Sequence, residues 1–165
     1  MEFKLRPWKL SDVGSLANHA NNRNISDNLT NQFPHPYTKK DGEEFIKMTL
    51  EQDPLNIFAI EINGEAVGGI GLHPQTDIHL KNAELGYWLA EPFWGNGIIT
   101  KAIKEIVPYG FKTFEIDRIF ARPFGTNVGS QRVLEKSNFI LEGKFEKTLY
   151  KNGTYMDELI YAVRK

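Results

Sequence analysis

The sequence predicts one mixed α/β domain over residues 1–165, with helices packed against a central sheet. Its length of 165 residues is that of a single domain. The predicted elements run strand, helix, helix, three strands, helix, strand, helix, two strands. Tight hairpins join some of these strands and helices join others. This mixture indicates an α/β sandwich (an α+β arrangement) with a mixed sheet, and not a doubly wound parallel sheet.

The N-terminal third predicts one strand and two helices. Residues 3–8 alternate apolar and polar side chains, which is the period of a strand. Ser11–Asp12 offers an N-cap for a helix over 13–20, and Thr38 offers one for a second helix. Between them, residues 21–37 predict a long polar loop. A loop of this length in a compact domain is usually functional or mobile.

The middle of the chain predicts a hairpin followed by a single strand. Residues 56–62 and 66–72 are apolar runs on either side of Asn63–Gly64. This dipeptide favours a type I′ turn, because both central positions of that turn need a positive φ. Residues 84–90 predict the next strand, and residues 91–97 predict a turn rich in glycine and aromatic side chains.

The C-terminal half predicts a long helix, a second helix and a closing hairpin. The long helix covers 98–114 and contains Pro108, where a kink is expected. Asn152–Gly153 marks a second tight turn. The elements after the long helix are strand 118–124, helix 127–137, strand 139–150 and strand 155–163. The whole chain is therefore expected to hold six to seven strands and four helices.

The composition excludes several classes of protein. Lys and Arg number 20 against 21 Asp and Glu, so the basic surplus of a nucleic-acid binder is absent. The chain has no cysteine, which excludes a disulfide scaffold, a cysteine nucleophile and a thiolate zinc site. Its four histidines lack metal-ligand spacing, so no metal is expected. No signal peptide or membrane span is recognisable, and a cytoplasmic protein is expected.

The most informative stretch joins strand 84–90 to the helix that begins near Ile98. Gly95 and Gly97 allow positive φ and close approach of a ligand to the backbone. Unpaired N–H groups and the helix dipole favour an anion at this helix start. The lysine of a P-loop is missing, and Thr100 replaces the third glycine of the dinucleotide fingerprint. For these residues alone, a purely structural turn is an equally good interpretation.

A second polar pair stands at the start of the helix over 127–137. Asn127 and Ser130 are three residues apart, so both lie on one side of that helix. A ligand group running beside the helix would meet both side chains. A plain N-cap is the alternative interpretation of Asn127.

Together these stretches resemble the GNAT superfamily of N-acetyltransferases. The closest likeness is to its branch of RimJ/RimL-like ribosomal-protein N-terminal acetyltransferases. It rests on the strand 84–90, the turn Trp94-Gly95-Asn96-Gly97-Ile98 and the helix from Asn127 to Lys136. Residues 33–38 and the closing Asn152-Gly153-x-Tyr155-x-Asp157 also match, so the resemblance spans nearly the whole chain.

The resemblance implies a mostly antiparallel GNAT-like sheet, acetyl-CoA as the donor and direct attack by a primary amine. The acceptor would be a protein N-terminal α-amine or a small-molecule amine, and the loop over 21–37 would shape its side of the site. Ile99 stands where the superfamily has Gly or Ala, which narrows the approach to the pyrophosphate. The pantetheine arm would add to the exposed strand edge. The residues implied to bind the donor are Leu89, Ala90, Trp94, Gly95, Asn96, Gly97, Ile98, Ile99, Thr100, Asn127 and Ser130.

Three side chains are candidates for the chemistry that the resemblance implies. Glu84 begins the key strand and is the candidate base for the amine, with an ion-paired or solvated strand end as the alternative. Ser130 is the candidate that protonates or stabilises the leaving thiolate. Tyr150 is the alternative donor, because many superfamily members use a tyrosine; otherwise it is an aromatic residue at a strand end.

Two other classes of function compete with an N-acetyltransferase. A non-catalytic acyl-CoA-binding regulatory protein would share the fold without turnover, and the presence of Asn127 and Ser130 counts against it. A nucleotide-binding domain would use the glycine turn, and the missing lysine and third glycine count against it. No nucleic acid or membrane is expected as a direct partner, and a homo-oligomer stays open.

Overall fold

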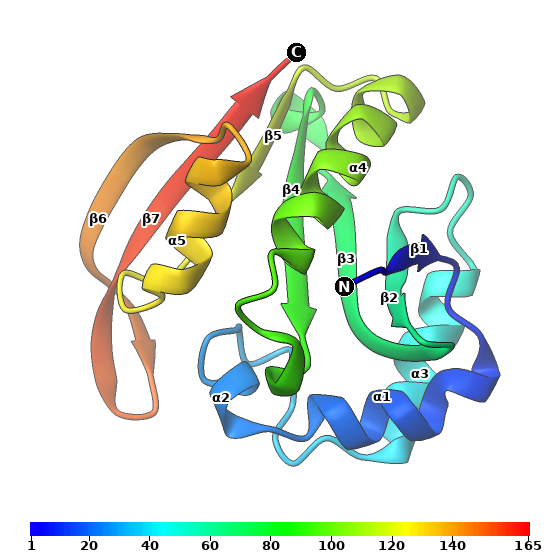
Figure 1. Ribbon diagram of the computed structural model, residues 1–165. Coiled ribbons are helices and arrows are strands. Elements are labelled where there is room, and N and C mark those ends of the chain that lie inside the picture. The colour runs from blue at the N-terminus through cyan, green and yellow to red at the C-terminus, as the bar shows by residue number, and fades with distance from the viewer. The chain divides into compact units, whose positions relative to one another are not determined.

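The structure is a computed structural model that describes residues 1–165. Its seven strands follow the order β1-β2-β3-β4-β5-β7-β6 in a mixed, mostly antiparallel sheet, accompanied by five helices (Figure 1). The predicted fold class is confirmed. The chain divides into two compact units, residues 1–71 with 86–102 and residues 72–85 with 103–165. A single domain over the whole chain stays a prediction.

The first unit holds the N-terminal elements. They are β1 (Lys4–Arg6), α1 (Val13–Ala20), α2 (Arg23–Ser26), α3 (Lys39–Leu50), β2 (Ile57–Ile62), the first part of β3 (Glu65–Pro74), the end of β4 (Asn82–Leu89) and the start of α4 (Ile98–Thr113). β1 pairs antiparallel with β2, and β2 with β3. Asn63 and Gly64 have φ angles of 51° and 85°, as the predicted turn requires. β1 is shorter than predicted because Pro7 has no N–H to continue the ladder.

A buried apolar cluster holds the first unit together. α1 and α3 lie side by side on this cluster (Figure 1), and the Trp8 and Phe45 rings meet edge to face at 5.6 Å. Thr38 caps α3 as predicted, accepting from the N–H of Asp41 at 3.2 Å. The buried members of the cluster are Trp8, Leu16, Ala17, Ala20, Tyr37, Ile46, Ile57, Ala59 and Ala66.

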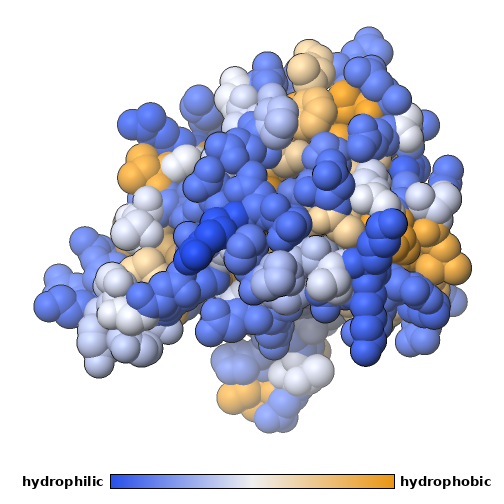
Figure 2. All heavy atoms as spheres, turned by 90° about the horizontal axis from the view of Figure 1, so that it is seen from below, coloured by the Kyte–Doolittle hydropathy of each residue, from blue (hydrophilic) through white to orange (hydrophobic).

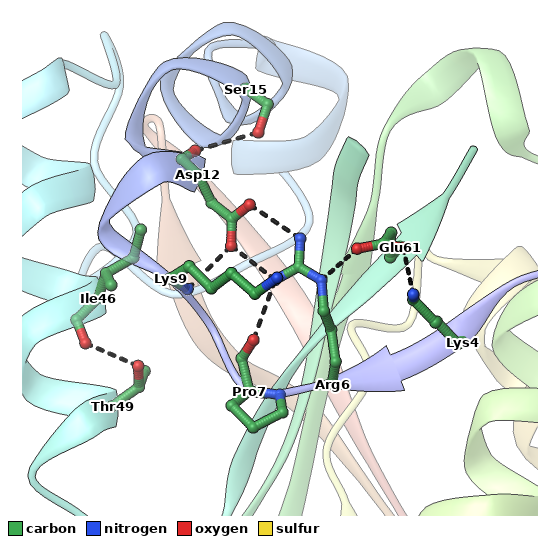
Figure 3. A network of polar contacts seen from close by, with 9 residues as sticks. All are labelled: Lys4, Arg6, Pro7, Lys9, Asp12, Ser15, Ile46, Thr49 and Glu61. Carbon is green, nitrogen blue, oxygen red and sulfur yellow. Dashed lines mark hydrogen bonds and ion pairs between the residues drawn. The ribbon is translucent and has the colours of Figure 1, made fainter. Parts of the chain in front are cut away.

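A buried ion network lies beside this cluster and corrects the predicted role of Asp12 (Figure 3). The guanidinium of Arg6 donates to both oxygens of Asp12 at 2.7 and 2.8 Å and also to the carboxylate of Glu61. Asp12 additionally accepts from the N–H of Lys9 at 2.9 Å. Its side chain makes no cap bond to α1. The ion pair with Arg6 therefore uses the carboxylate that the sequence assigned to a cap of α1.

The segment over 21–37 was predicted to be a loop throughout, but it contains the short helix α2. Asn22 caps the short helix α2, accepting from the N–H of Asn24 at 2.8 Å. The segment closes at its base, because the N–H of Tyr37 donates to the Asn21 side-chain oxygen at 3.0 Å. α2 is the helix that the sequence did not predict, because its single turn is too short to show a 3.6-residue period.

The second unit holds the C-terminal elements. They are the rest of β3, β4 and α4, with β5 (Arg118–Ala121), α5 (Val128–Lys136), β6 (Ile140–Lys151) and β7 (Thr154–Arg164). β4 pairs parallel with β5, β5 antiparallel with β7, and β7 antiparallel with β6. The Tyr161 hydroxyl donates to Glu135 at 3.0 Å, which ties α5 to β7.

β6 is the terminal strand of the sheet order and its pairing with β7 is irregular. The register shifts between Leu141 and Gly143 and again between Phe145 and Leu149. Within the second irregularity Lys147 has a φ of 52°, and its N–H donates to the Asp157 carboxylate at 2.9 Å. Asp157 of the closing motif thus holds a bulge in the neighbouring strand.

The exterior is mainly polar where Figure 2 displays it. On that face, hydrophilic residues dominate and the apolar residues form small separate groups. None of the helices has the length and apolar character needed to cross a membrane.

Candidate functional site

The turn before α4 adopts the conformation that the sequence predicts. Gly95 and Gly97 have φ angles of 77° and 71°. A Cβ on either glycine would meet no atom within 4 Å, so backbone conformation, and not crowding, requires glycine here. The N–H of Lys101 donates to the Gly97 carbonyl at 3.1 Å. The N–H groups of residues 98–100 come before this first helical hydrogen bond. The N–H groups of a first helical turn have no partner within the helix and can bind an anion.

The side chains of Trp94 and Asn96, which were predicted to bind acetyl-CoA, make hydrogen bonds within the turn. The indole N–H of Trp94 donates to the Leu89 carbonyl at 2.7 Å and ties the turn to the end of β4. The amide nitrogen of Asn96 donates to the carbonyls of Phe93 and Trp94, each at 3.1 Å. These bonds preorganise the glycine turn. Direct contact of either side chain with a donor molecule stays a prediction.

The backbone of Ala90 is already bonded within the protein. Its N–H donates to the Val67 carbonyl at 2.8 Å, and its carbonyl accepts from the N–H of Phe93 at 3.0 Å. A ligand would have to displace the first bond or share the carbonyl. The Leu89 carbonyl is likewise engaged by the Trp94 indole, so hydrogen bonds from acetyl-CoA to the backbone of Leu89 stay a prediction.

Gly68, which the sequence reasoning did not single out, lets β3 lie close to the end of β4. A Cβ on Gly68 would lie 2.6 Å from the Trp88 carbonyl oxygen and 3.2 Å from the Cα of Leu89. Packed backbone cannot swing away from such a contact as a side chain can. The signal was the Gly68–Gly69 pair inside a strand, which is typical of close backbone approach.

Aromatic contacts place the segment over 21–37 beside β4. The Phe33 ring lies 5.8 Å from the Trp88 ring and 5.1 Å from the Tyr37 ring. Burial, with a smaller contribution from the Asp41 charge, raises the pKa of Tyr37 to about 12. Tyr37 is therefore neutral at physiological pH and serves as part of the apolar support.

In the second unit, Asn127 is the N-cap of α5. Its side-chain oxygen accepts from the N–H of Ser130 at 3.1 Å, so the structural interpretation of Asn127 is confirmed. The cap uses the oxygen of Asn127 and the backbone of Ser130. The Asn127 amide nitrogen and the Ser130 hydroxyl take no part in that bond. Their predicted roles toward a donor stay open to test.

Glu84 forms a two-pronged ion pair with Arg122. The guanidinium donates to the two carboxylate oxygens at 2.9 and 3.0 Å. These hydrogen bonds raise the pKa of Arg122, against the opposing effect of burial. The ion-paired strand end that the sequence left as an alternative is therefore present. Arg122, which the sequence reasoning did not identify, therefore occupies both carboxylate oxygens of the predicted base.

Tyr150 lies near the tip of the β6–β7 hairpin. Its side chain pairs across the strands with Tyr155, with ring centroids 4.9 Å apart, and Tyr150 is 64% exposed. Asn152 and Gly153 have φ angles of 52° and 75°, as the predicted turn requires. A proton-donating role for Tyr150 stays a prediction.

The predicted site residues are distributed over the two compact units. Leu89 and the residues of the turn belong to the first unit, while Glu84, Asn127, Ser130 and Tyr150 belong to the second. No group of three or more His, Asp or Glu side chains is arranged to hold a metal ion.

Comparison with known proteins decides the family. Residues 2–140 match the family model described as "Acetyltransferase (GNAT) domain". The chain belongs to the GNAT acetyltransferase family. The resemblance identified from the glycine turn and the α5 motif is thereby confirmed.

Relatives of this GNAT chain include proteins named for ribosomal substrates. It is 37% identical over 103 residues to the putative ribosomal N-acetyltransferase YdaF of Bacillus subtilis (strain 168), covering 62% of the chain and 56% of the relative. It is 31% identical over 106 residues to the ribosomal-protein-serine acetyltransferase of Escherichia coli (strain K12), covering 64% and 59%. The match thus spans less than two thirds of each relative.

Solved structures support the GNAT fold independently. The chain superposes with a TM-score of 0.85 on RimL, the ribosomal L7/L12 alpha-N-protein acetyltransferase solved in complex with coenzyme A. That match covers 98% of the chain and 93% of RimL at 22% sequence identity. At this identity the likeness concerns the fold alone.

Proposed function

We propose that the protein is an acetyl-CoA-dependent N-acetyltransferase that transfers an acetyl group to a primary amine. The observation that carries this proposal is the turn with left-handed Gly95 and Gly97 at the start of α4, within a GNAT domain. Its N–H groups suit the pyrophosphate of the donor. Trp94 supports the proposal by fixing this turn to the end of β4.

The chemistry proposed is direct transfer. The amine nitrogen attacks the thioester carbonyl carbon, and a backbone N–H near Leu89 stabilises the oxyanion. The carbon–sulfur bond then breaks, the amide forms, and the thiolate takes a proton from Ser130 or water. The amine loses one proton, to Glu84 or to water, and no metal takes part. A protein of this fold that binds acyl-CoA without turnover is the competing function.

The acceptor class proposed is a protein N-terminal α-amine, with small-molecule amines as the alternative. The names of two relatives point to ribosomal proteins. An α-amine has a pKa of about 8, so a weak base or water suffices to deprotonate it. The near-zero net charge supports the absence of a direct nucleic-acid partner, and a cytoplasmic location without a membrane partner is part of the proposal. Formation of a homo-oligomer is left to measurement.

The proposal is tested by donor binding and turnover. Acetyl-CoA should raise the melting temperature while ATP and NAD do not. Release of CoA should then require a peptide with a free N-terminus and stop with the same peptide blocked at its α-amine. Spermidine serves as the small-molecule acceptor. Binding without CoA release for any amine would favour the non-catalytic protein, and a shift by ATP or NAD alone would favour a nucleotide-binding domain.

Gly97→Val should abolish the rise in melting temperature caused by acetyl-CoA. A β-branched residue at a φ of 71° is strained, and its side chain would also block the approach to the backbone. Gly64→Val is the matched control, because Gly64 also has a left-handed φ and open space around it. The control should lose stability but keep the shift. An unchanged shift in folded Gly97→Val would contradict this donor site.

Glu84→Gln should lower kcat/KM most below the pKa of the amine, if Glu84 is the base. At low pH the acceptor is largely protonated and needs a base, whereas above a pKa of about 8 free amine is abundant. The measurement is kcat/KM from about pH 6 to 9.5. Arg122→Met removes the cation bound to Glu84 but keeps its carboxylate, and should not reproduce this profile. An equal rate loss at every pH in both variants would show that the Glu84–Arg122 ion pair stabilises the fold and that Glu84 is not the base.

A further inference from the structure

Glu91 makes a contact that the proposed chemistry does not use. It lies in the 3₁₀ turn over Glu91–Phe93, directly after β4 and before the glycine turn. Its carboxylate accepts from the side-chain amide of Asn22 at 2.7 Å and from that of Asn24 at 3.1 Å. These partners precede it by almost 70 residues in the chain.

The asparagines that bind Glu91 are themselves fixed. The oxygen of Asn22 caps α2 while its nitrogen binds Glu91. The carbonyl of Asn24 accepts from the side chain of Asn28 at 2.9 Å. Asn21 closes the base of the same segment through the N–H of Tyr37. Three nearby asparagines therefore fix the segment: Asn21 closes its base, Asn22 caps α2, and Asn22 and Asn24 bind Glu91.

The segment over 21–37 is therefore attached to the donor side at two places. Phe33 contacts Trp88 on β4, and the α2 end is bound to Glu91 in the turn that follows β4. We propose that Glu91 is a positioning residue that fixes the segment over 21–37 as the acceptor wall beside the donor strand. This inference rests on the proposed acetyl transfer and adds a determinant of acceptor affinity.

The chemistry of the contact fits this role. The amide hydrogen bonds from Asn22 and Asn24 lower the pKa of Glu91. The carboxylate therefore keeps its charge, and the contact with it, at any pH above the ordinary glutamate range. Hydrogen bonds to an ionised acceptor are stronger than neutral ones. Attachment should weaken only as the pH falls through the lowered pKa, far below the pH of an acetyltransferase assay.

Glu91→Gln tests the inference, because it keeps the size of the side chain but turns one acceptor oxygen into a third amide donor. We expect faster hydrogen–deuterium exchange within residues 21–37. We also expect a KM for the amine about fivefold to tenfold higher, the loss that corresponds to about one net hydrogen bond. The KM for acetyl-CoA should stay within twofold. Glu51→Gln is the control, since Glu51 is an exposed carboxylate at the end of α3 in the same unit.

The outcomes separate the two proposals. No CoA release from the wild type with any amine would overturn the proposed function. Turnover by the wild type with an unchanged amine KM in Glu91→Gln would overturn the positioning role, whether or not exchange rises. A larger effect on acetyl-CoA than on the amine would also overturn it, because the contact would then serve the donor turn. Equal changes in Glu51→Gln would assign the effect to the loss of charge.

Discussion

Arg6→Met should lower the free energy of unfolding by about 3–5 kcal/mol, the loss typical of removing one partner from a buried ion pair. Arg6, Asp12 and Glu61 each have side chains no more than 10% exposed. Methionine fills similar space but leaves the Asp12 carboxylate without a cation and Glu61 with Lys4 alone, as the contacts in Figure 3 show. Urea unfolding at neutral pH measures the difference. Arg6→Lys keeps the charge without the two-pronged geometry and should lose less.

Lys4→Met is the matched control for the network. Lys4 binds the same Glu61 carboxylate at 2.9 Å, but its side chain is 66% exposed. An exposed ion pair contributes about 0–1 kcal/mol, so this variant should be nearly as stable as the wild type. Equal losses in Arg6→Met and Lys4→Met would show that burial does not decide the strength of these pairs.

The difference between Arg6→Met and the wild type should shrink in acid. Burial alone would raise the pKa of Asp12, but hydrogen bonds from Arg6 and Lys9 outweigh it and hold the pKa below its usual value. A carboxyl with a lowered pKa stabilises the fold above its unfolded-state pKa, and this contribution is lost as the pH falls through the lowered value. Without Arg6, burial dominates and protonation of Asp12 becomes favourable. Unfolding curves from about pH 7 down to about pH 3 should therefore converge.

Ser130→Ala should lower kcat by about 10²- to 10⁴-fold, the usual contribution of a general acid, if Ser130 serves the leaving thiolate. The substitution spares the α5 cap, because Asn127 accepts from the Ser130 backbone and not from its hydroxyl. The rise in melting temperature caused by acetyl-CoA should therefore persist. Single-turnover release of CoA measures the effect on the chemical step.

Two companion variants assign the proton donor. Ser130→Thr retains a hydroxyl and should recover much of the rate lost in Ser130→Ala. Tyr150→Phe should leave kcat nearly unchanged, since Tyr150 is largely exposed and its ring packs at a tilt against that of Tyr155. Full turnover in Ser130→Ala together with a large loss in Tyr150→Phe would transfer the role to Tyr150. Full turnover in both would leave it to water.

Features set by neighbouring residues could be predicted from the sequence. The cap at Thr38, the turn at Asn63–Gly64 and the positive φ angles of Gly95 and Gly97 are all as expected. Each depends on residue type within a few positions, where steric and hydrogen-bonding preferences act directly. The order of strands and long helices followed from periodicity for the same reason.

Features set by distant partners could not be predicted. Asp12 met the local rule for a cap, but its carboxylate binds Arg6, which the pairing of β1 with β2 also brings to Glu61. Ala90 was expected to offer its backbone to a ligand, but Val67 of β3 already accepts its N–H. Glu84 matched the position of a base, and nothing adjacent in sequence indicated that Arg122 would bind it. These outcomes depend on which strands the fold places together, which no local pattern contains.

The irregular pairing of β6 has a consequence for the protein at high concentration. A terminal strand presents backbone groups that can template the addition of another chain and so begin aggregation. In β6 the two register shifts interrupt the ladder, and the strand carries charged side chains of both signs, namely Glu142, Lys144, Glu146, Lys147 and Lys151. An incoming strand would lose register at these interruptions and would meet charged side chains along the strand. Growth of the sheet from chain to chain is thus disfavoured, and a stable homo-oligomer would have to form through other surfaces.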